Sequence, residues 1–367
     1  MRTLLVLTVP RCAEKLQPLV PRLAAKGSVD VYMLGEMSPK TEWYGDHDIR
    51  SVFINRNRDN LFRIIHGPGY PKWGDLQVGK DAFKEIDFEN YDIVIVDDNR
   101  IEAHLGFYTM AQKCKKYGVT LFGTPHANGN SPHVPASSLD LYDYIFCYGE
   151  LDYEVYKTQH SMAPSRMLIG GYPSTDRIWE KKGDDKHILV VLNLLGFRAK
   201  GTWGIEEVAD KEFMNTLGLE KLQDKLQVPI VFKVKSRFDE KENHGKSWSD
   251  SHHYVSDLAG DLDHEVITDV YDDCSLLLHS KLTISCSPTL ALKSIATLNP
   301  TFFLRTAGMP GNLGSYPCAY DPRRIDLYDE WKHFSPRAVS LFRRKAIGNF
   351  GTDRYMLHIN SIHAANT

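Results

Sequence analysis

The sequence predicts an α/β protein with two doubly wound parallel sheets, one in a domain of residues 1–178 and one in a domain of residues 179–367. Three observations support this prediction. Short apolar strands alternate with amphipathic helices, which is typical of parallel strands covered on both faces. The alternation pauses near residues 170–186, where a charged, Gly-containing run suits a linker, and then restarts. A chain of 367 residues is also long enough for two separate cores.

In the first domain, we expect strands at residues 3–9, 29–34, 51–55, 93–97, 120–123, 144–147 and 167–169. Between them, amphipathic segments favour helices at residues 13–26, 77–85 and 103–117. In sheets of this kind, ligands bind beyond the carboxyl ends of the strands. A two-domain chain therefore places its site in a cleft between the domains.

In the second domain, we expect strands at residues 187–193, 229–234, 265–268, 282–284 and 301–304. Helices are expected at residues 205–226 (with a break), 270–279, 289–297 and 336–347. The last helix carries Arg343 and Arg344 on a basic face that suits an anionic surface. A solvated face, or a C-terminal helix that crosses back over the domains, is the interpretation that we favour.

Composition excludes several classes of protein. The net charge of −3 gives no overall basic field for nucleic acid, although a local basic groove stays open. The six cysteines are scattered without CxxC spacing, which favours reduced thiols in a cytoplasmic protein. The N-terminal apolar run is too short to span a bilayer and lacks a cleavage site, so no integral membrane segment is expected.

The most informative segment is residues 282–304. A short apolar strand ends in the hydroxyl residues Ser285, Ser287 and Thr289, and a helix and a second apolar strand follow. Hydroxyl groups at a helix N-terminus, with free backbone N–H groups and the positive end of the dipole, suit phosphate. Alternatively, Ser287 simply caps the helix.

Several segments resemble, in order, the GT-B superfamily, which includes glycosyltransferases, teichoic-acid-type glycerophosphotransferases and UDP-N-acetylglucosamine 2-epimerase. In the first domain, the matching segments are a strand that ends in Gly (residues 141–149) and a G-x-P-x-x-D stretch (residues 167–176). In the second domain, they are the first strand of the nucleotide-binding domain (residues 188–193), a basic strand end (residues 232–237) and an "S-x-S, helix, Pro" loop (residues 285–300). The resemblance covers roughly residues 120–305. It implies two Rossmann-like domains facing a cleft, with a nucleotide-sugar donor bound by the second domain.

One position departs from the superfamily. Many members carry a Glu in the helix after the Ser loop, where it holds the nucleotide ribose, and the matching residue here is Lys293. An ammonium group only donates hydrogen bonds and therefore cannot accept them from ribose hydroxyls. Either the ribose is held otherwise, or Lys293 contacts phosphate, or the alignment is shifted.

The remaining donor candidates combine cations with a strand-to-helix turn. Lys233, Lys235 and Arg237 alternate, so period two places them on one face, where they suit a diphosphate leaving group. A solvated edge-strand face is the alternative. The full predicted donor set is Asn193, Gly196, Lys233, Lys235, Arg237, Ser285, Ser287, Thr289 and Lys293.

The predicted base is His126, in a Gly- and Asn-containing loop after an apolar strand, assisted by Asp98. The alternatives are a His satisfied within a turn and a helix N-cap at Asp98 or Asn99. Because no third ligand accompanies the acidic pair at a convincing spacing, no metal is expected. The predicted acceptor-binding residues are Gly67, Gly69, Tyr70, Trp73 and Asp97, and a loop packed by its own side chains is the alternative for the first four.

These features predict a metal-independent, inverting glycosyltransferase without a cofactor, which takes its sugar from a nucleoside-diphosphate sugar such as a UDP-sugar. The hydroxyl acceptor stays open between a glycan, a small molecule and a modified nucleic-acid base. Alternatives are a CDP-polyol-dependent polyol-phosphate transferase, a UDP-sugar epimerase and a catalytically silent nucleotide-sugar-binding protein.

Overall fold

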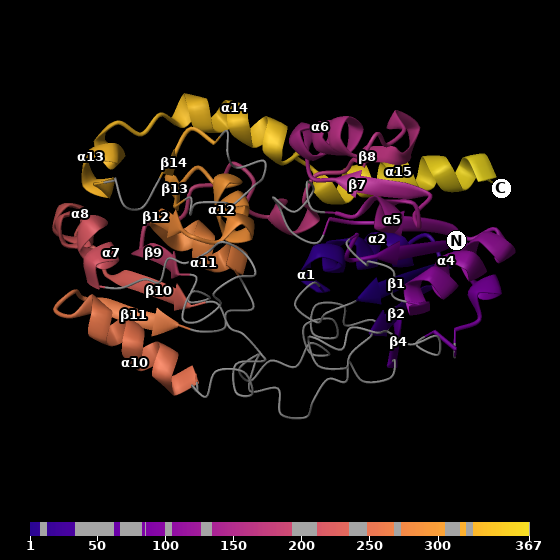
Figure 1. The fold of residues 1–367 in the computed structure, drawn as a ribbon, viewed down its shortest axis with the longest axis horizontal. Coiled ribbons are helices and arrows are strands. Elements are labelled where there is room, and N and C mark those ends of the chain that lie inside the picture. Colours follow the sequence, from indigo (N-terminus) through magenta and orange to yellow (C-terminus); the bar gives the residue numbers. More distant parts are fainter. Residues whose placement is uncertain are drawn as a thin grey trace. The chain divides into compact units, whose positions relative to one another are not determined.

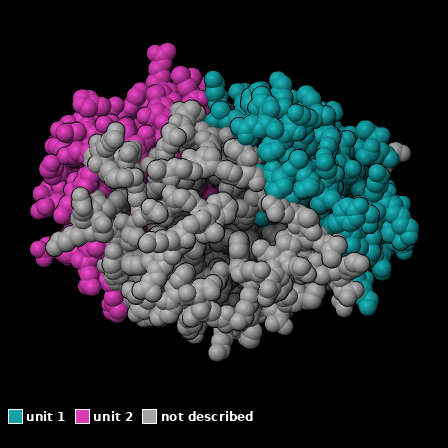
Figure 2. Space-filling model, in the orientation of Figure 1, with its two compact units in different colours: residues 1–42, 46–176, 345–367 teal, residues 43–45, 177–344 magenta. Residues whose placement is uncertain are grey.

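The computed structural model describes residues 1–7, 13–33, 62–66, 83–84, 86–99, 105–125, 134–192, 211–234, 248–267, 273–304, 316–320 and 326–366. The chain divides into two compact units, which Figure 2 shows in different colours. Among the described residues, unit 1 holds everything up to Asp176 and everything from Lys345 onward. Unit 2 holds Arg177–Arg344.

Unit 1 is built on a parallel sheet with the order β4-β2-β1-β5-β6-β7-β8 in its described part (Figure 1). Its strands are β1 (Thr3–Leu7), β2 (Val29–Met33), β4 (Phe62–His66), β5 (Ile93–Val96), β6 (Thr120–Gly123), β7 (Tyr144–Cys147) and β8 (Met167–Ile169). The central strands are buried along their whole length because helices cover both faces. From β1 the chain first builds outward through β2 and β4 and then returns to β5, so the strand order reverses between β1 and β5.

The helices of unit 1 use both faces of this sheet. On one face, Phe107 and Met110 of α4 join the core around Val94 and Val96. On the other face, Tyr355 stacks on Phe146 with ring centroids 3.7 Å apart. The helices are α1 (Ala13–Leu16), α2 (Val20–Ala24), α4 (Leu105–Tyr117), α5 (Ala136–Leu139), α6 (Glu150–Gln159) and α15 (Gly351–Asn366), with 3₁₀ turns η2 (Gln17–Leu19), η3 (Phe88–Asn90), η5 (Pro164–Arg166) and η6 (Pro173–Thr175).

Unit 2 has a parallel sheet with the order β11-β10-β9-β12-β13-β14 in its described part. The strands are β9 (His187–Leu192), β10 (Ile230–Val234), β11 (His264–Ile267), β12 (Ser280–Ser285), β13 (Thr301–Leu304) and β14 (Ala319–Tyr320). The helices are α7 (Lys211–Thr216), α8 (Leu219–Leu226), α10 (Trp248–Ala259), α11 (Asp273–His279), α12 (Pro288–Ile295), α13 (Leu327–Lys332) and α14 (Pro336–Ala346). The order reverses between β9 and β12, so these two strands flank the switch point of unit 2.

The predicted fold class, two Rossmann-like doubly wound sheets, is confirmed. Two predicted helices are broken where the backbone requires it. Residues 13–26 form α1, η2 and α2 because Pro18 and Pro21 provide no N–H for a continuous ladder. Within residues 205–226, α7 and α8 are separated at Gly218, whose φ is +63°.

Several elements were not expected from the sequence: β4, β14, α5, α6, α10, α13 and α15. The strand expected at residues 51–55 lies outside the described residues, and so does the helix expected at 77–85, apart from Phe83 and Lys84. The second domain was predicted as residues 179–367 with a C-terminal helix that could cross back, and in the structure the segment from Lys345 onward belongs to unit 1. The physical reason is that α15 buries Tyr355, Met356 and Ile359.

Candidate functional site

The two strands at the switch point of unit 2 carry the predicted donor residues at their carboxyl ends. Ser285 is the last residue of β12, and Asn193 follows β9. In the register of the sheet, Ser285 pairs with Val191 of β9, and Lys233 of β10 pairs with the same residue from the other side. Partners in a parallel sheet project to the same face, so Ser285 and Lys233 lie on the face that α11 and α12 cover through Leu277 and Leu290.

The turn between β12 and α12 is fixed by its own hydroxyl group. Ser285 Oγ donates to the carbonyl of Ser287 at 3.0 Å and accepts from the Ser287 N–H at 3.1 Å. Cys286 N–H continues the sheet ladder to the Val191 carbonyl at 2.9 Å. This turn delivers the chain directly into the first turn of α12.

Ser287 occupies the N-cap position of α12, but its side chain makes no capping hydrogen bond. The interpretation that Ser287 simply caps the helix is therefore wrong in this structure. Its carbonyl accepts the first helical bond, from Ala291 N–H at 2.9 Å, and Pro288 contributes no N–H. The positive end of α12 thus carries an uncommitted Ser287 hydroxyl group, which suits an anion.

Lys233 and Lys293 meet at one carboxylate. Lys233 Nζ lies 3.3 Å from Asp273 Oδ1, and Lys293 Nζ lies 3.2 Å from Asp273 Oδ2. The side chain of Lys293 is only 3% exposed, so its ammonium is committed to Asp273 beneath the surface rather than presented at the helix N-terminus. Burial would raise the pKa of Asp273, but Lys233 and Lys293 outweigh it and lower that pKa, so the carboxylate stays ionised.

The carboxyl end of the unit 1 sheet is held by a buried polar network. Asp97 is fully buried, and Asp98 and Asn99 are buried beside it. The Tyr142 hydroxyl donates to the Asp98 carbonyl at 2.7 Å, and the Asn99 amide donates to the Tyr156 hydroxyl at 2.6 Å. Burial, followed by the nearby Asp98 and Asp97, raises the pKa of Tyr142, so this hydroxyl stays a donor. The acceptor role of Asp97 stays a prediction, and direct contact would require these surroundings to open.

The chain leaves β6 along a fixed path. Thr124 N–H and Oγ1 both donate to the Val96 carbonyl at 3.0 Å. The next carbonyl, of Pro125, accepts from Lys15 Nζ at 2.9 Å and from the Tyr148 hydroxyl at 3.0 Å. Lys15 Nζ also donates to the Asp97 carbonyl at 3.2 Å, which ties β6 to β5. The residue bonded to Pro125 is His126, so this network fixes the point from which the predicted base departs.

The structure brings together some of the predicted residues and leaves others untested. Ser285, Ser287, Thr289, Lys233 and Lys293 all belong to unit 2 at the carboxyl end of its sheet or on α12. Outside the described residues lie His126, Asn193, Gly196, Lys235, Arg237, Gly67, Gly69, Tyr70 and Trp73, so their roles stay predictions.

Sequence reasoning missed Lys15, Tyr148 and Asp273. Lys15 had a visible signal, since it lies one helical turn before Leu19 in line with the apolar stripe of the predicted helix. Asp273 had none, because an acidic residue in the first turn of a helix is ordinary. Among the described residues, no cluster of three or more His, Cys, Asp or Glu side chains is arranged to hold a metal ion.

Comparison with known proteins identifies the fold. No family model matches the chain, and no curated protein matches its sequence. Among solved structures, a putative UDP-N-acetylglucosamine 2-epimerase from Listeria monocytogenes superposes with a TM-score of 0.65 at 12% identity, covering 100% of this chain and 97% of its own. The UDP-GlcNAc 2-epimerase of Methanocaldococcus jannaschii, in complex with UDP-GlcNAc and UDP, gives 0.60 at 13% identity, covering 99% and 100%.

A glycosyltransferase from Rickettsia africae gives a TM-score of 0.56 at 9% identity, covering 100% of this chain and 98% of its own. Epimerases and glycosyltransferases are therefore both similar to this chain over its full length. At these identities the likeness shows the fold, and the chain has the two Rossmann-like domains of the GT-B type.

Proposed function

We propose that this protein is a glycosyltransferase that moves a sugar from a UDP-sugar to a hydroxyl acceptor. The observation that supports it most is the N-terminus of α12 at the switch point of unit 2, where the Ser287 hydroxyl caps nothing. The carboxyl edge of a doubly wound sheet at its switch point is where such domains bind nucleotides. The choice of UDP is supported by the complexes with UDP among the structures of the same fold.

In the proposed reaction, the donor diphosphate binds at Ser285, Ser287 and the first turn of α12. His126 removes the proton of the acceptor hydroxyl group, and the acceptor oxygen forms a bond to the anomeric carbon. The bond from that carbon to the diphosphate oxygen breaks, and UDP leaves with the electron pair. The positive end of the α12 dipole stabilises the negative charge that grows on the leaving group.

A second candidate is UDP-sugar epimerisation, which needs no acceptor. It is favoured by the higher TM-scores of the two epimerases, 0.65 and 0.60, against 0.56 for the glycosyltransferase. The two reactions differ in what happens to the donor. Transfer releases UDP only when an acceptor is present, whereas epimerisation at C2 of the sugar exchanges the proton at that carbon with solvent.

The test uses UDP-GlcNAc in D₂O, with and without a panel of hydroxyl acceptors. Transfer predicts acceptor-dependent release of UDP with no deuterium at C2, and deuterium at C2 without any acceptor would establish the epimerase instead. His126→Ala should lower the turnover by about 10²-fold or more while UDP binding persists. The matched control is His333→Ala, which changes an exposed histidine at the C-cap of α13. Unchanged turnover of His126→Ala would remove this residue as the base.

A further inference from the structure

Helix α14 presents a basic face to solvent, opposite to the face by which it packs. The buried side chains of the helix share one face, and they are Val339, Phe342, Arg343 and Ala346. The exposed side chains follow the spacing i, i+4, i+7 and i+8, and they are Arg337, Leu341, Arg344 and Lys345. We call these four residues the outer stripe of α14. In this stripe three cations surround one leucine.

The structure corrects the sequence-based assignment of Arg343 to the basic face. Arg343 is 3% exposed, and its guanidinium donates to the carbonyls of Ile295 at 2.5 Å and Thr297 at 2.7 Å. It also pairs with Glu180 at 3.3 Å. Arg343 therefore fastens α14 to the C-terminal end of α12, and the outer stripe is carried by a helix that is fixed to the rest of unit 2.

A groove in unit 2 adds apolar surface beside the outer stripe. The groove has a volume of about 460 Å³, and its apolar lining comes from Leu298, Phe334, Pro336 and Val339. Arg337 belongs to both the groove and the stripe, so it lies between Leu298 on one side and Leu341, one helical turn away, on the other. These two leucines are 50% and 60% exposed. Exposed aliphatic side chains among exposed cations are typical of a helix that lies on a membrane surface.

The charge around α14 differs in sign from that of the whole protein. Residues 331–352 contain five Lys or Arg residues and no Asp or Glu, whereas the whole chain has a net charge of −3. Such a block attracts an anionic surface although the protein as a whole is slightly negative. Each Lys or Arg near an anionic bilayer strengthens binding by roughly fivefold, so three cations correspond to roughly a hundredfold.

The leucines distinguish between two kinds of polyanion. Nucleic acids offer bases that stack on aromatic rings and phosphates that pair with cations, and an exposed leucine gains little from either. In a bilayer, Leu341 enters the boundary between headgroups and acyl chains, while Arg337 and Arg344 keep their guanidinium groups at the lipid phosphates. The outer stripe therefore fits an anionic membrane surface better than it fits nucleic acid.

We infer that α14 docks this protein on the surface of an anionic lipid bilayer, with its three exposed cations at the headgroup phosphates and Leu341 inserted between them. The inference goes beyond the proposed function and does not depend on it, because none of the stripe residues belongs to the predicted donor, acceptor or catalytic sets.

The experiment is co-sedimentation of the full-length protein with vesicles of phosphatidylcholine, with or without about one third phosphatidylglycerol. The wild-type protein should bind the anionic vesicles roughly tenfold or more tightly than the neutral ones, and added salt should weaken this binding. The double variant Arg337→Gln/Arg344→Gln should bind the anionic vesicles roughly tenfold or more weakly than wild type. The matched control is Lys115→Gln/Lys116→Gln, which removes the same charge from exposed positions of α4 in unit 1 and should keep the wild-type affinity.

A second pair of variants tests the insertion of the leucine. Leu341→Ala should lower the affinity for anionic vesicles by roughly threefold or more, because less apolar surface enters the bilayer. Leu357→Ala removes a similarly exposed leucine from α15, outside the outer stripe, and should leave the affinity unchanged.

Four results overturn the inference: equal binding of the wild-type protein to both kinds of vesicle, wild-type affinity of the arginine double variant, wild-type affinity of Leu341→Ala, or binding of a single-stranded oligonucleotide as tight as that of the anionic vesicles. The last result would show a general polyanion surface instead. If a variant fails to fold, the comparisons of the two vesicles and the oligonucleotide on the wild-type protein still decide the question.

Discussion

At the residue scale, Lys15 is a buried cation that donates hydrogen bonds to main-chain carbonyls. Its ammonium donates to the carbonyls of Asp97 and Pro125, and the side chain is buried. Lys15→Met keeps the apolar stem but removes the donor from both carbonyls. We expect unit 1 to lose about 2 kcal/mol of unfolding free energy, since buried acceptors are left without this donor. Urea unfolding measures the loss, and Lys157→Met, at a half-exposed position of α6, should change it by less than about 0.5 kcal/mol.

The same carbonyl of Pro125 offers a test of how the base is held. Tyr148→Phe removes one of its two donors while Lys15 Nζ remains. Turnover should fall more than UDP affinity, because the carbonyl belongs to the residue before His126 and not to the donor site. Steady-state kinetics and UDP titration separate the two effects. A variant that loses UDP affinity with turnover unchanged would contradict this role for Tyr148.

The charge on Asp273 also makes a pH prediction. Its folded pKa lies below the ordinary 3.8, so its ionised form contributes stability that is fully present above the unfolded pKa. That contribution is lost as the pH falls through the lowered folded pKa. The difference in unfolding free energy between wild type and Asp273→Asn should therefore be constant from about pH 5 to 7 and shrink below about pH 4. Urea unfolding at pH 7, 5 and 3 checks this, and a constant difference at pH 3 would argue against a lowered pKa.

At the element scale, two glycines with positive φ interrupt or end helices, and their replacement measures the cost of that backbone conformation. Gly218 between α7 and α8 has φ of +63°, and Gly260 after α10 has φ of +57°. A Cβ on Gly260 would meet nothing within 4 Å, whereas one on Gly218 would lie 3.0 Å from Asp326 Oδ1. Gly260→Ala should cost about 1 kcal/mol from the left-handed backbone alone. Gly218→Ala should cost more, and thermal unfolding of the pair isolates the contact with Asp326.

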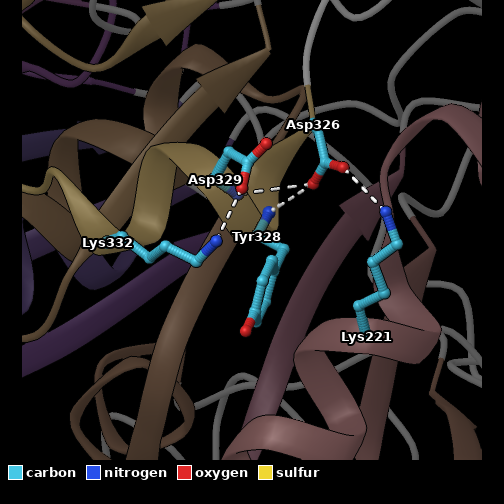
Figure 3. Close-up of polar contacts among 5 residues, drawn as sticks. All are labelled: Lys221, Asp326, Tyr328, Asp329 and Lys332. Atoms are coloured by element: carbon cyan, nitrogen blue, oxygen red, sulfur yellow. Dashed lines mark hydrogen bonds and ion pairs between the residues drawn. The ribbon is translucent and has the colours of Figure 1, made fainter.

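Asp326 also acts at the scale of an element, because it is the N-cap residue of α13. Its Oδ1 accepts from Tyr328 N–H at 2.9 Å and from Asp329 N–H at 3.4 Å, and its Oδ2 pairs with Lys221 Nζ at 3.0 Å. Figure 3 shows these contacts. Asn caps helices about as well as Asp, so Asp326→Asn keeps the cap and loses only an exposed ion pair. Asp326→Asn therefore serves as the control for Asp273→Asn in the urea unfolding experiment.

What the sequence could predict at this scale depends on how local the cause is. Strands β6 and β13 match the predicted bounds because their apolar residues are contiguous. Residues 181–186 have the composition of a linker, but Lys186 N–H donates to the His279 carbonyl at 2.8 Å and Asp184 pairs with His279 at 2.5 Å. Those partners are nearly a hundred residues away, so no local pattern reveals them. The cluster at Asp273 escaped prediction for the same reason, since three separate elements supply it.

At the scale of the whole molecule, the end of the chain completes the unit with which the chain begins. Asp176, the last residue of the G-x-P-x-x-D stretch, accepts from Gly351 N–H at 2.6 Å and Thr352 N–H at 2.8 Å, which caps α15. The ring of Tyr355 lies against Gly170, where a Cβ would clash, and stacks on Phe146. The G-x-P-x-x-D stretch therefore has a structural explanation: within unit 1, its Gly170 packs against α15 and its Asp176 caps that helix.

This arrangement predicts that residues 1–176 do not form a stable unit alone. Without α15, the ring of Phe146 loses its stacking on Tyr355, and the carboxylate of Asp176 loses the Gly351 and Thr352 N–H groups. Burial of Tyr355 alone is worth about 3–5 kcal/mol. A fusion of residues 1–176 to residues 345–367 through a flexible Gly/Ser linker should unfold cooperatively in urea, whereas residues 1–176 alone should lack a cooperative transition. In the fusion, Tyr355→Ala should destabilise strongly, and Leu357→Ala, 65% exposed on the same helix, should have little effect. If residues 1–176 alone unfolded cooperatively at the same urea midpoint as the fusion, α15 would not contribute to the stability of unit 1.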